Sequence, residues 1–382
     1  MSPSRPAPAA DYEPCMAEAI ELALRGRGEV EPNPRVGAVA LRGETVVGRG
    51  WHRVWGGPHA EVEALREAAT AGGCDTLVVT LEPCSSARGQ AGKKTPPCVP
   101  AILDAGVRRV VIGSPDADPR HRGAGIVQLR AAGVEVIEGV HGARCAAINR
   151  PFARWLGLDR PWTIAKWAMT LDGKIATADG ESRWITAAPA RIRAHALRAS
   201  VDAVVVGMGT VLADDPALTV RHVAGASPLR VVIDPDGALP LTSQLAITAR
   251  ATRVLAIVAE HAAAAPAAAS RLAALEAAGV EVLAVPGGPG RRVDLAVAWR
   301  ALRARGLRRV MVEGGGKLLG SLFDADCIDQ VVAFMAGKVF GGASAPSPVG
   351  GVGVTELAAA WTFVETDVRP CGDDFVVTAV RG

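Results

Sequence analysis

Four side chains in the first third of the chain have the types and spacing needed to bind and use a metal ion. They are His59 and Glu61, two residues apart, and Cys84 and Cys98, each preceded by a proline. One imidazole and two thiolates supply three zinc ligands and leave the fourth position to water, as in catalytic zinc sites. Zinc lowers the pKa of such a water from about 15.7 to about 7, so hydroxide can attack an amidine-like ring carbon. Ammonia leaves only after its nitrogen gains a proton, and we expect the non-ligand carboxylate of Glu61 to carry that proton.

The spacing of these residues follows the zinc nucleobase deaminase signature, H-x-E then P-C-x-x-C, only in part. His59-Ala60-Glu61 matches, but the thirteen residues 85–97 separate the two cysteines instead of two. On a regular helix His59 and Glu61 would lie about 200° apart, so both face one metal only where a helix begins. The preceding residues 56–58, Gly-Gly-Pro, favour a helix start there. Taken singly, a histidine could be only a helix cap and each cysteine a small apolar residue. The grouping favours zinc.

A glycine-rich turn in the second half could bind a nucleotide. Glu313-Gly314-Gly315-Gly316-Lys317 lies between a predicted strand and a predicted helix. The P-loop pattern fails because Leu318 follows the lysine, and no strand is followed by G-x-G-x-x-G as in a Rossmann fold. What remains is a row of backbone N–H groups at a helix start, which suits a pyrophosphate. The same glycines could instead only form a tight turn.

Strands and helices alternate along the chain, which predicts two α/β domains, at residues 1–155 and 160–382. In the first domain we expect helices at 13–24, 59–71, 99–105 and 126–132, a hairpin over 36–49, and strands at 77–80, 108–112 and 134–137. The alternation pauses at 149–161, the expected boundary. In the second domain we expect strands at 163–169, 203–206, 229–233, 254–258, 282–284, 310–312 and 330–334, and helices at 189–198, 267–277 and 295–303. Residues 262–269 read as a solvated loop running into a helix.

Composition narrows the class of protein. At roughly 150 residues per domain, 382 residues suit two domains, and 49% hydrophobic with 21% charged residues excludes a disordered chain. A net charge of +3 gives no sign of nucleic-acid or membrane binding. No stretch is long and apolar enough for a membrane span, and residues 1–10 lack the apolar core of a signal peptide. Seven cysteines form a poor disulfide framework, so we expect a cytoplasmic protein.

Five short motifs occur in the order found in one enzyme family. They are Pro-Asn-Pro-Arg-Val-Gly at 32–37, Gly-Trp-His at 50–52, Gly-Pro-His-Ala-Glu-Val at 57–62, Thr-Leu-Glu-Pro-Cys-Ser at 80–85 and Thr-Pro-Pro-Cys at 95–98. The chain thus resembles the bifunctional riboflavin-biosynthesis deaminase/reductases. The resemblance implies a cytidine-deaminase-like α/β/α layered domain that removes the 2-amino group of 2,5-diamino-6-ribosylamino-4(3H)-pyrimidinone 5′-phosphate. It implies these roles: zinc ligands His59, Cys84 and Cys98, proton shuttle Glu61, pyrimidine contacts Asn33 and His52, and phosphate contact Lys94.

The resemblance continues through the second half of the chain. The matching motifs lie at 166–174, 180–185, 195–198, 207–216 and 312–315. They imply a dihydrofolate-reductase-like α/β domain that uses NADPH to reduce the ribosyl group of the deaminated intermediate to ribityl. Hydride transfer depends mainly on positioning, so no catalytic histidine is required. The implied NADPH site is Ala168, Trp184, Thr210, Asp214, Gly314, Gly315, Gly316 and Lys317. The implied substrate site is Lys174, Ser182, Arg198, Leu218, Arg221 and Glu313.

Two other functions remain open. The chain could be a zinc deaminase for a different aminopyrimidine or pterin-like nucleotide, with or without a working reductase domain. Two features favour this hypothesis: Ser86 lies where the family usually has histidine, and residues 87–93 are added. It could also be a nucleotide-binding protein with a structural zinc. A structural zinc site, however, requires no carboxylate beside the metal that is not a ligand, and Glu61 is such a carboxylate. The expected partners are a pyrimidine ribotide and further copies of the chain, with neither nucleic acid nor membrane.

Overall fold

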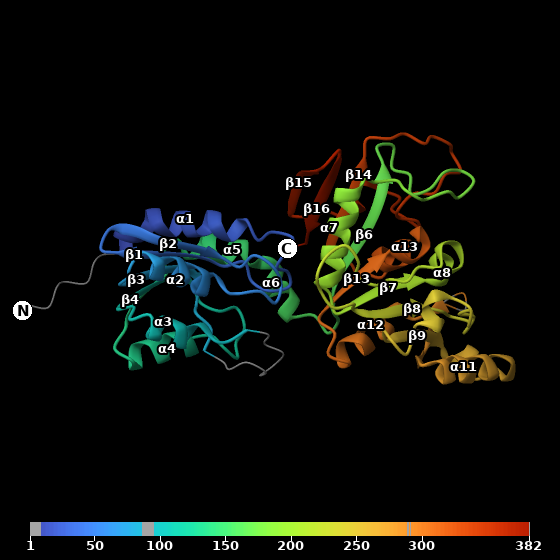
Figure 1. The fold of residues 1–382 in the computed structure, drawn as a ribbon, viewed down its shortest axis with the longest axis horizontal. Coiled ribbons are helices and arrows are strands. Elements are labelled where there is room, and N and C mark those ends of the chain that lie inside the picture. Colours follow the sequence, from blue (N-terminus) through green and yellow to red (C-terminus); the bar gives the residue numbers. More distant parts are fainter. Residues whose placement is uncertain (1–8, 86–94, 289, 291, 382) are drawn as a thin grey trace, which may run out of the picture. The chain divides into compact units, whose positions relative to one another are not determined.

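The computed structural model describes residues 9–85, 95–288, 290 and 292–381. The chain divides into two compact units, Met1–Gly157 and Leu158–Gly382, and each unit is built around its own sheet (Figure 1). Within the described residues, no helix combines the length and apolar character needed to cross a bilayer.

The first unit contains a five-stranded sheet in the order β2-β1-β3-β4-β5. The strands are β1 (Gly37–Arg42), β2 (Thr45–Trp51), β3 (Thr76–Leu81), β4 (Arg109–Ser114) and β5 (Glu135–Glu138). The β1–β2 pair is the predicted antiparallel hairpin, β1 also pairs antiparallel with β3, and β3, β4 and β5 run parallel. The helices are α1 (Glu13–Leu24), α2 (Ala60–Thr70), α3 (Cys98–Asp104), α4 (Ala124–Ala131), α5 (Gly142–Ile148) and α6 (Arg150–Leu156), after a short 3-10 helix, Ala9–Tyr12.

Alternate residues of the strands face two separate cores. Val39 of β1 packs with α1 and α5 on one face of the sheet, whereas Ala38 and Ala40 pack with α2, α3 and α4 on the other. This gives the expected α/β/α layers. Two glycines of β2 bring α2 close to the sheet, since a Cβ atom at Gly50 would lie 2.1 Å from the Ala60 carbonyl oxygen. The start of α2 is therefore held against the sheet.

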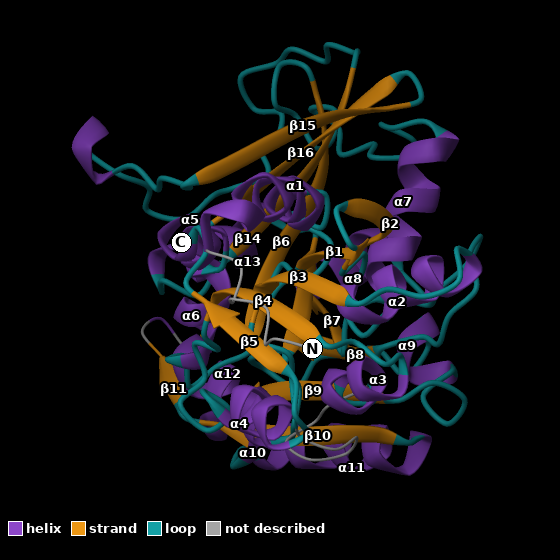
Figure 2. Ribbon diagram, turned by 90° about the vertical axis from the view of Figure 1, so that its left-hand side faces the viewer, coloured by secondary structure: helices purple, strands orange, loops and turns teal. Residues whose placement is uncertain are grey.

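The second unit contains a nine-stranded sheet in the order β10-β9-β8-β7-β13-β6-β14-β16-β15, which Figure 2 shows from β10 at the bottom to β15 at the top. The strands from β10 to β14 run parallel, and β16 and β15 add an antiparallel hairpin. These strands are β6 (Trp162–Thr170), β7 (Ala203–Gly207), β8 (Leu229–Ile233), β9 (Val254–Ala259), β10 (Val280–Val285), β13 (Arg309–Glu313), β14 (Gln330–Ala336), β15 (Glu365–Cys371) and β16 (Asp374–Val380). Two short strands, β11 (Gly287–Gly288) and β12 (Arg292–Val293), pair separately.

The helices of the second unit mostly connect its parallel strands. They are α7 (Ala188–Ala199), α8 (Met208–Asp214), α9 (Gln244–Ile247), α10 (Glu260–Ala263), α11 (Pro266–Ala278), α12 (Leu295–Ala304) and α13 (Gly316–Asp324), with a 3-10 turn at Leu357–Ala359. Helices α12 and α13 contribute Trp299 and Leu322 to the core that covers one face of the sheet. This is the layered α/β architecture that the alternating pattern predicts.

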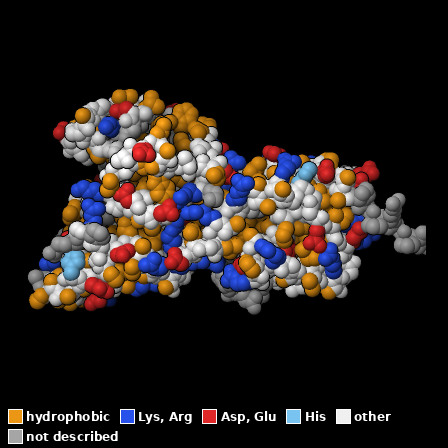
Figure 3. Space-filling model, turned by 180° about the vertical axis from the view of Figure 1, so that it is seen from behind, with side chains coloured by type: hydrophobic (Ala, Val, Ile, Leu, Met, Phe, Trp, Pro, Cys, Tyr) orange, Lys and Arg blue, Asp and Glu red, His pale blue; other side chains and the backbone are white. Residues whose placement is uncertain are grey.

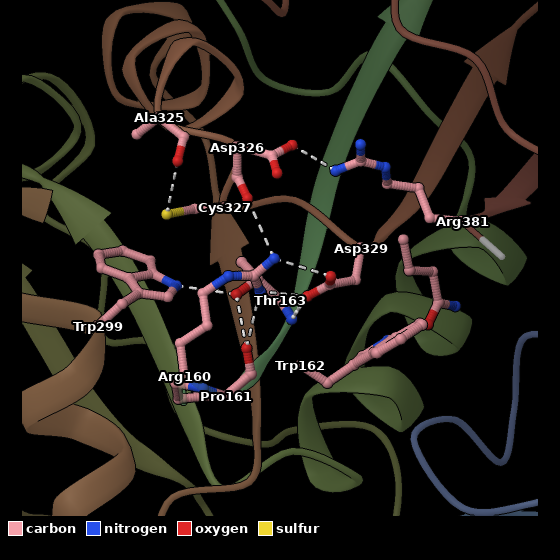
Figure 4. A network of polar contacts seen from close by, with 11 residues as sticks. Arg160, Pro161, Trp162, Thr163, Trp299, Ala325, Asp326, Cys327, Asp329 and Arg381 are labelled. Carbon is pink, nitrogen blue, oxygen red and sulfur yellow. Dashed lines mark hydrogen bonds and ion pairs between the residues drawn. The ribbon is translucent and has the colours of Figure 1, made fainter. Parts of the chain in front are cut away.

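A buried polar network fixes the starts of β6 and β14 beside each other (Figure 4). Arg160 donates from Nη1 to Asp329 Oδ2 at 2.5 Å, and the same oxygen accepts the Thr163 backbone N–H at 2.9 Å. The Trp299 indole donates to Thr163 Oγ1 at 2.8 Å, which ties α12 to β6. Because Asp329 is fully buried, its charge depends on these partners. The network holds the register of β6, the strand that carries Lys166 and Ala168.

The structure adds a helix to the sequence-based pattern and corrects one segment. The expected boundary segment, residues 149–161, contains helix α6, whereas residues 262–269, predicted as a loop running into a helix, are largely helical, in α10 and α11. In both cases a proline, Pro151 or Pro266, lies in the first turn, where its missing N–H costs no helical hydrogen bond. The β15–β16 hairpin was not predicted, because β15 is half exposed and contains Pro370, which only an edge strand tolerates well.

Candidate active sites

The three expected zinc ligands meet at the ends of three elements of the first unit. His59 immediately precedes α2 in an extended conformation, Cys84 follows β3, and Cys98 is the first residue of α3. His59 Nδ1 lies 3.1 Å from Cys98 Sγ and 3.6 Å from Cys84 Sγ, and all three ligand atoms lie within 4.8 Å of one another. Tetrahedral zinc, with Zn–N about 2.0 Å and Zn–S about 2.3 Å, requires N–S separations of about 3.5 Å. The donor set and its spacing therefore fit zinc.

Glu61 lies beside this cluster with one carboxylate oxygen unused. Helix α2 begins only at Ala60, so Glu61 lies in its first turn and His59 lies just before the helix. The separation of about 200° that His59 and Glu61 would have on a continuous helix therefore does not apply. The side chain is 3% exposed, and Oε2 has no hydrogen-bond partner among the described residues. Burial raises the pKa of Glu61, while nearby His59 opposes that rise. This is the arrangement required of a proton shuttle that is not itself a ligand.

Thr95 orients the His59 imidazole. Its Oγ1 lies 2.8 Å from His59 Nε2, on the opposite side of the ring from the sulfur atoms. With Nδ1 directed at the cluster, Nε2 carries the proton and donates a hydrogen bond to Thr95 Oγ1, as the other ring nitrogen of a metal-binding histidine usually does to an oxygen. Sequence reasoning assigned Thr95 no role. Its position in the Thr-Pro-Pro-Cys motif was the available signal.

Backbone hydrogen bonds explain how cysteines so far apart in sequence converge. The Cys84 carbonyl accepts the N–H of Cys98 at 3.0 Å and of Val99 at 3.2 Å, so the start of α3 is tied to the loop after β3. Buried Glu82 holds that loop from the other side, through the N–H groups of Asp116 and Gly123 to Oε2 and of Gly125 to Oε1. Glu82 is a further residue that sequence reasoning missed. A carboxylate directly after a fully buried strand was its signal.

Asn33 and His52, the expected pyrimidine contacts, lie together next to the cluster. His52 Nδ1 is 2.8 Å from the Pro58 carbonyl and therefore donates to it, which leaves Nε2 to accept from Asn33 Nδ2 at 3.3 Å. Burial lowers the pKa of His52 to about 4, so its ring is neutral. The rings of His52 and His59 meet edge to face at 5.5 Å. Lys94, Ser86 and the added residues 87–93 lie outside the described residues.

In the second unit, the glycine-rich turn joins β13 to α13 and packs against Thr210. Gly314 and Gly315 have φ values of 77° and 70°, a region that favours glycine. A Cβ atom at either position would lie 3.2 Å from Thr210 Oγ1, in the first turn of α8. The first N–H groups of α13, at Gly316 and Lys317, have no partner within the helix and can bind an anion. Thr210 and the turn thus form one candidate nucleotide site.

The remaining candidate cofactor residues lie near the end of α8 and on β6. Ser182 Oγ donates to Asp214 Oδ1 at 3.3 Å, which links an expected substrate residue to an expected cofactor residue. Trp184 is 63% exposed, and its carbonyl accepts from Lys338 Nζ at 3.0 Å. Ala168 pairs with Phe334 of β14.

Glu313 is the centre of a largely buried charge cluster, in which its own side chain is 12% exposed. Arg198 of α7 donates to it with two nitrogens, Nε to Oε1 at 2.8 Å and Nη2 to Oε2 at 2.9 Å. Lys166 Nζ lies 3.5 Å from Oε2. Burial alone would raise the pKa of Glu313, but Lys166 and Arg198 outweigh it and hold that pKa at about 2. Sequence reasoning gave Lys166 no role, although it begins the Lys166–Lys174 motif.

Of the four other expected substrate residues, Leu218 and Arg221 lie beside this cluster, whereas Ser182 and Lys174 bond elsewhere. Arg198 Nη1 donates to the Thr219 carbonyl at 2.7 Å, which places Leu218 and Arg221 next to the Arg198–Glu313 pair. Lys174 Nζ donates instead to the Ala345 carbonyl at 3.1 Å. Among the described contacts, Lys174 and Ala168 make no bond to the Arg198–Glu313 pair.

Both halves of the sequence match known families, and whole relatives match nearly the entire chain. The family described as the cytidine and deoxycytidylate deaminase zinc-binding region matches residues 10–114, and the one described as the RibD C-terminal domain matches residues 161–377. Riboflavin biosynthesis protein RibD of Aquifex aeolicus is 36% identical over 363 residues, 95% of this chain and 96% of that protein. The protein of the same name from Escherichia coli is 34% identical and covers 94% of this chain and 96% of its own length.

Solved structures agree with the sequence comparison. Acinetobacter baumannii RibD, form 1, superposes with a TM-score of 0.68 at 32% identity, covering 98% of this chain and 100% of that one. A Thermotoga maritima protein described as a diaminohydroxyphosphoribosylaminopyrimidine deaminase/5-amino-6-(5-phosphoribosylamino)uracil reductase has a TM-score of 0.66 at 34% identity. That match covers 98% of this chain and 99% of the other.

Proposed function

The chain belongs to the RibD family of bifunctional riboflavin-biosynthesis deaminase/reductases, and we propose that its two units act in turn on one pyrimidine ribotide. Residues 1–155 would deaminate 2,5-diamino-6-ribosylamino-4(3H)-pyrimidinone 5′-phosphate, and residues 160–382 would reduce the ribosyl group of the product to ribityl with NADPH. The observation that carries the first step is the convergence of His59, Cys84 and Cys98 beside Glu61.

The deaminase residues divide into those that hold the metal, those that move protons and those that bind the base. Zinc held by His59, Cys84 and Cys98 would lower the pKa of a water molecule and so supply the nucleophile. Glu61 Oε2 takes up a proton and delivers it to the exocyclic nitrogen, which then leaves as ammonia. Asn33 and His52 bind the pyrimidine edge next to the cluster. Lys94 is assigned to the phosphate, to which an ammonium offers a compact point charge.

For the reductase, we assign the pyrophosphate of NADPH to the helix start at Gly314, Gly315, Gly316 and Lys317. NADPH would supply the hydride. The packing of Thr210 against this turn supports its place in the same site, and Asp214, Trp184 and Ala168 complete the assignment. Glycine at the turn keeps the backbone open to a pyrophosphate, since any side chain there would meet Thr210.

The substrate of the reductase is assigned to Lys174, Ser182, Arg198, Leu218, Arg221 and Glu313. Glu313 remains ionised beside Lys166 and Arg198, so it can accept hydrogen bonds from ribose hydroxyl groups. Arg198 already donates Nε and Nη2 to Glu313, so it chiefly holds that carboxylate. Arg221 is then the guanidinium available to bind the phosphate.

We further propose that the enzyme is a cytoplasmic homo-oligomer. None of the seven cysteines, all of which lie in the described part of the chain, forms a disulfide, as is usual in a reducing compartment. Strand β15 is the last strand of its sheet, and Val364, Val368 and Phe375 near it are 63%, 58% and 46% exposed. Figure 3 shows one face of the molecule, on which hydrophobic side chains reach the surface among mixed charges. An exposed apolar edge of this kind is covered in oligomers. Light scattering of the purified protein tests the oligomeric state.

The function is tested by supplying the diaminopyrimidine ribotide with and without NADPH and following ammonia and NADPH oxidation separately. We expect ammonia without NADPH, and NADPH oxidation only after deamination. Ammonia from a different aminopyrimidine, with none from this ribotide, would overturn the assigned substrate. A preference for NADH over NADPH would overturn the assigned cofactor.

A further inference from the structure

The segment at residues 215–222, which follows α8, adopts an unusual backbone conformation. Three of its non-glycine residues have positive φ: Asp215 at 38°, Leu218 at 53° and His222 at 67°. Residues with a Cβ atom adopt this region only where their surroundings hold them there. The same segment carries Leu218 and Arg221, two of the proposed substrate residues. Something in the fold must therefore hold the segment in place.

Three buried side chains bond three alternate residues of the segment. The bonds run from Arg230 Nη1 to the Ala217 carbonyl at 3.1 Å, from Arg198 Nη1 to the Thr219 carbonyl at 2.7 Å, and from the Arg221 backbone N–H to His195 Nδ1 at 3.1 Å. Arg230 belongs to β8, whereas His195 and Arg198 lie one turn apart on α7. All three are less than 9% exposed, so water does not compete for these bonds.

Neither His195 nor Arg230 has a role in the reaction proposed so far, and of the two it is His195 that bonds Arg221. Because Nδ1 accepts a backbone N–H, the ring is neutral and its proton lies on Nε2. Burial, followed by the charges of Arg198 and Arg221, lowers its pKa to about 4, against the opposing effect of Glu313. The ring of His222 meets it edge to face at 5.0 Å. The acceptor is therefore available throughout the neutral pH range.

We propose that His195 is a positioning residue for the reductase: by accepting the Arg221 backbone N–H, it fixes the direction in which Arg221 meets the substrate. This inference rests on the proposed function, since it assumes that the 215–222 segment binds the ribotide. His195 acts through Arg221 and takes no part in hydride transfer. Its loss should weaken substrate binding and leave cofactor binding and deamination unchanged.

The test compares three substitutions in the full-length protein. H195L and H195A both remove the hydrogen-bond acceptor, but H195L keeps a side chain of similar size and H195A does not. H195N places an amide oxygen where Nδ1 lies. The readouts are kcat, KM for the deaminated ribotide, KM for NADPH, and ammonia release by the deaminase unit of the same preparation. Loss of one buried hydrogen bond is worth roughly tenfold in binding. We expect KM for the ribotide to rise roughly tenfold in H195L and H195A. In H195N we expect this KM to stay close to the wild-type value.

Separate controls distinguish failure of this inference from failure of the proposed function. Reduction of the ribotide by the wild-type protein tests the proposed function alone. Where that reduction occurs, an unchanged KM for the ribotide in H195L or H195A overturns the positioning role. An equal loss in H195N and H195A overturns it as well, and so does a parallel rise in KM for NADPH, because each points to a merely structural residue.

Discussion

Glu313 and Lys166 occupy paired positions on the adjacent parallel strands β13 and β6, with Lys166 Nζ 3.5 Å from Glu313 Oε2. Arg198 of α7 adds two hydrogen bonds to the same carboxylate. Three elements separated widely in sequence thus meet at one largely buried anion. Glu313 is the last residue of β13, and the glycine turn follows it directly. The proposed substrate and cofactor sites therefore meet at the end of this one strand.

Replacing Glu61 with glutamine should leave zinc bound and lower ammonia release by 10²- to 10⁴-fold, the usual contribution of a general acid–base. The amide keeps the shape of the side chain but cannot carry the proton. Zinc content and ammonia release of the same sample measure the two effects. E67Q is the matched control, since Glu67 lies on the same helix but is exposed. Near-wild-type deamination by E61Q would exclude Glu61 as the shuttle.

Removing the metal should separate the two activities. A chelator is expected to abolish ammonia release, while the second unit, whose assigned residues include none of the zinc ligands, continues to reduce an already deaminated ribotide with NADPH. Zinc added back should restore ammonia release. Loss of NADPH oxidation on the deaminated substrate after chelation would show that the division of labour between the units is incorrect.

Substituting Gly315 with alanine should raise KM for NADPH about tenfold or more. The new Cβ atom would meet Thr210 Oγ1 at 3.2 Å in a backbone conformation with φ of 70°. Gly306→Ala is the control, because Gly306 also has a positive φ, 83°, but no atom lies within 4 Å of its added Cβ. The control shares the backbone strain and lacks the contact with Thr210. Equal values of KM for NADPH in the two variants would argue against a nucleotide site at this turn.

The titration of His195 should be visible in the pH dependence of the free energy of unfolding. Its folded pKa of about 4 lies below the ordinary value of 6.5, so the unfolded chain binds more protons between these pH values. The wild-type protein should therefore lose up to about 3 kcal/mol of unfolding free energy through this group as pH falls from 6.5 to 4. H195N cannot titrate and should lose less. Denaturant unfolding at several pH values measures the difference, and parallel curves for the two proteins would contradict the assigned pKa.

Much of the fold and of both candidate sites is predictable because it is encoded locally. Alternating apolar runs give the strands, Gly43 gives the β1–β2 turn, and the His59, Cys84 and Cys98 motifs give the ligand set. The strand order is not local. Nothing in the spacing indicates that β13 lies between β7 and β6, and the meeting of Glu313 with Lys166 depends on that order.

The supporting residues were harder to predict for the same reason. Thr95, Glu82 and His195 act through contacts with groups that lie between 26 and 43 residues away in sequence. A threonine or glutamate that holds a backbone or a ring has no distinctive spacing. The β15–β16 hairpin was missed because its exposed face alternates with only weakly apolar residues, as in Glu365–Cys371. Whether such a segment forms a strand depends on the neighbouring strands against which it packs, and these are distant in sequence.

X-ray absorption at the zinc edge of the active, full-length enzyme tests the central claim most directly. We expect one zinc per chain with one nitrogen and two sulfur ligands from His59, Cys84 and Cys98, and an oxygen in the fourth position. A deaminase that is active without metal, or a zinc ion with four protein ligands and no oxygen, would contradict it.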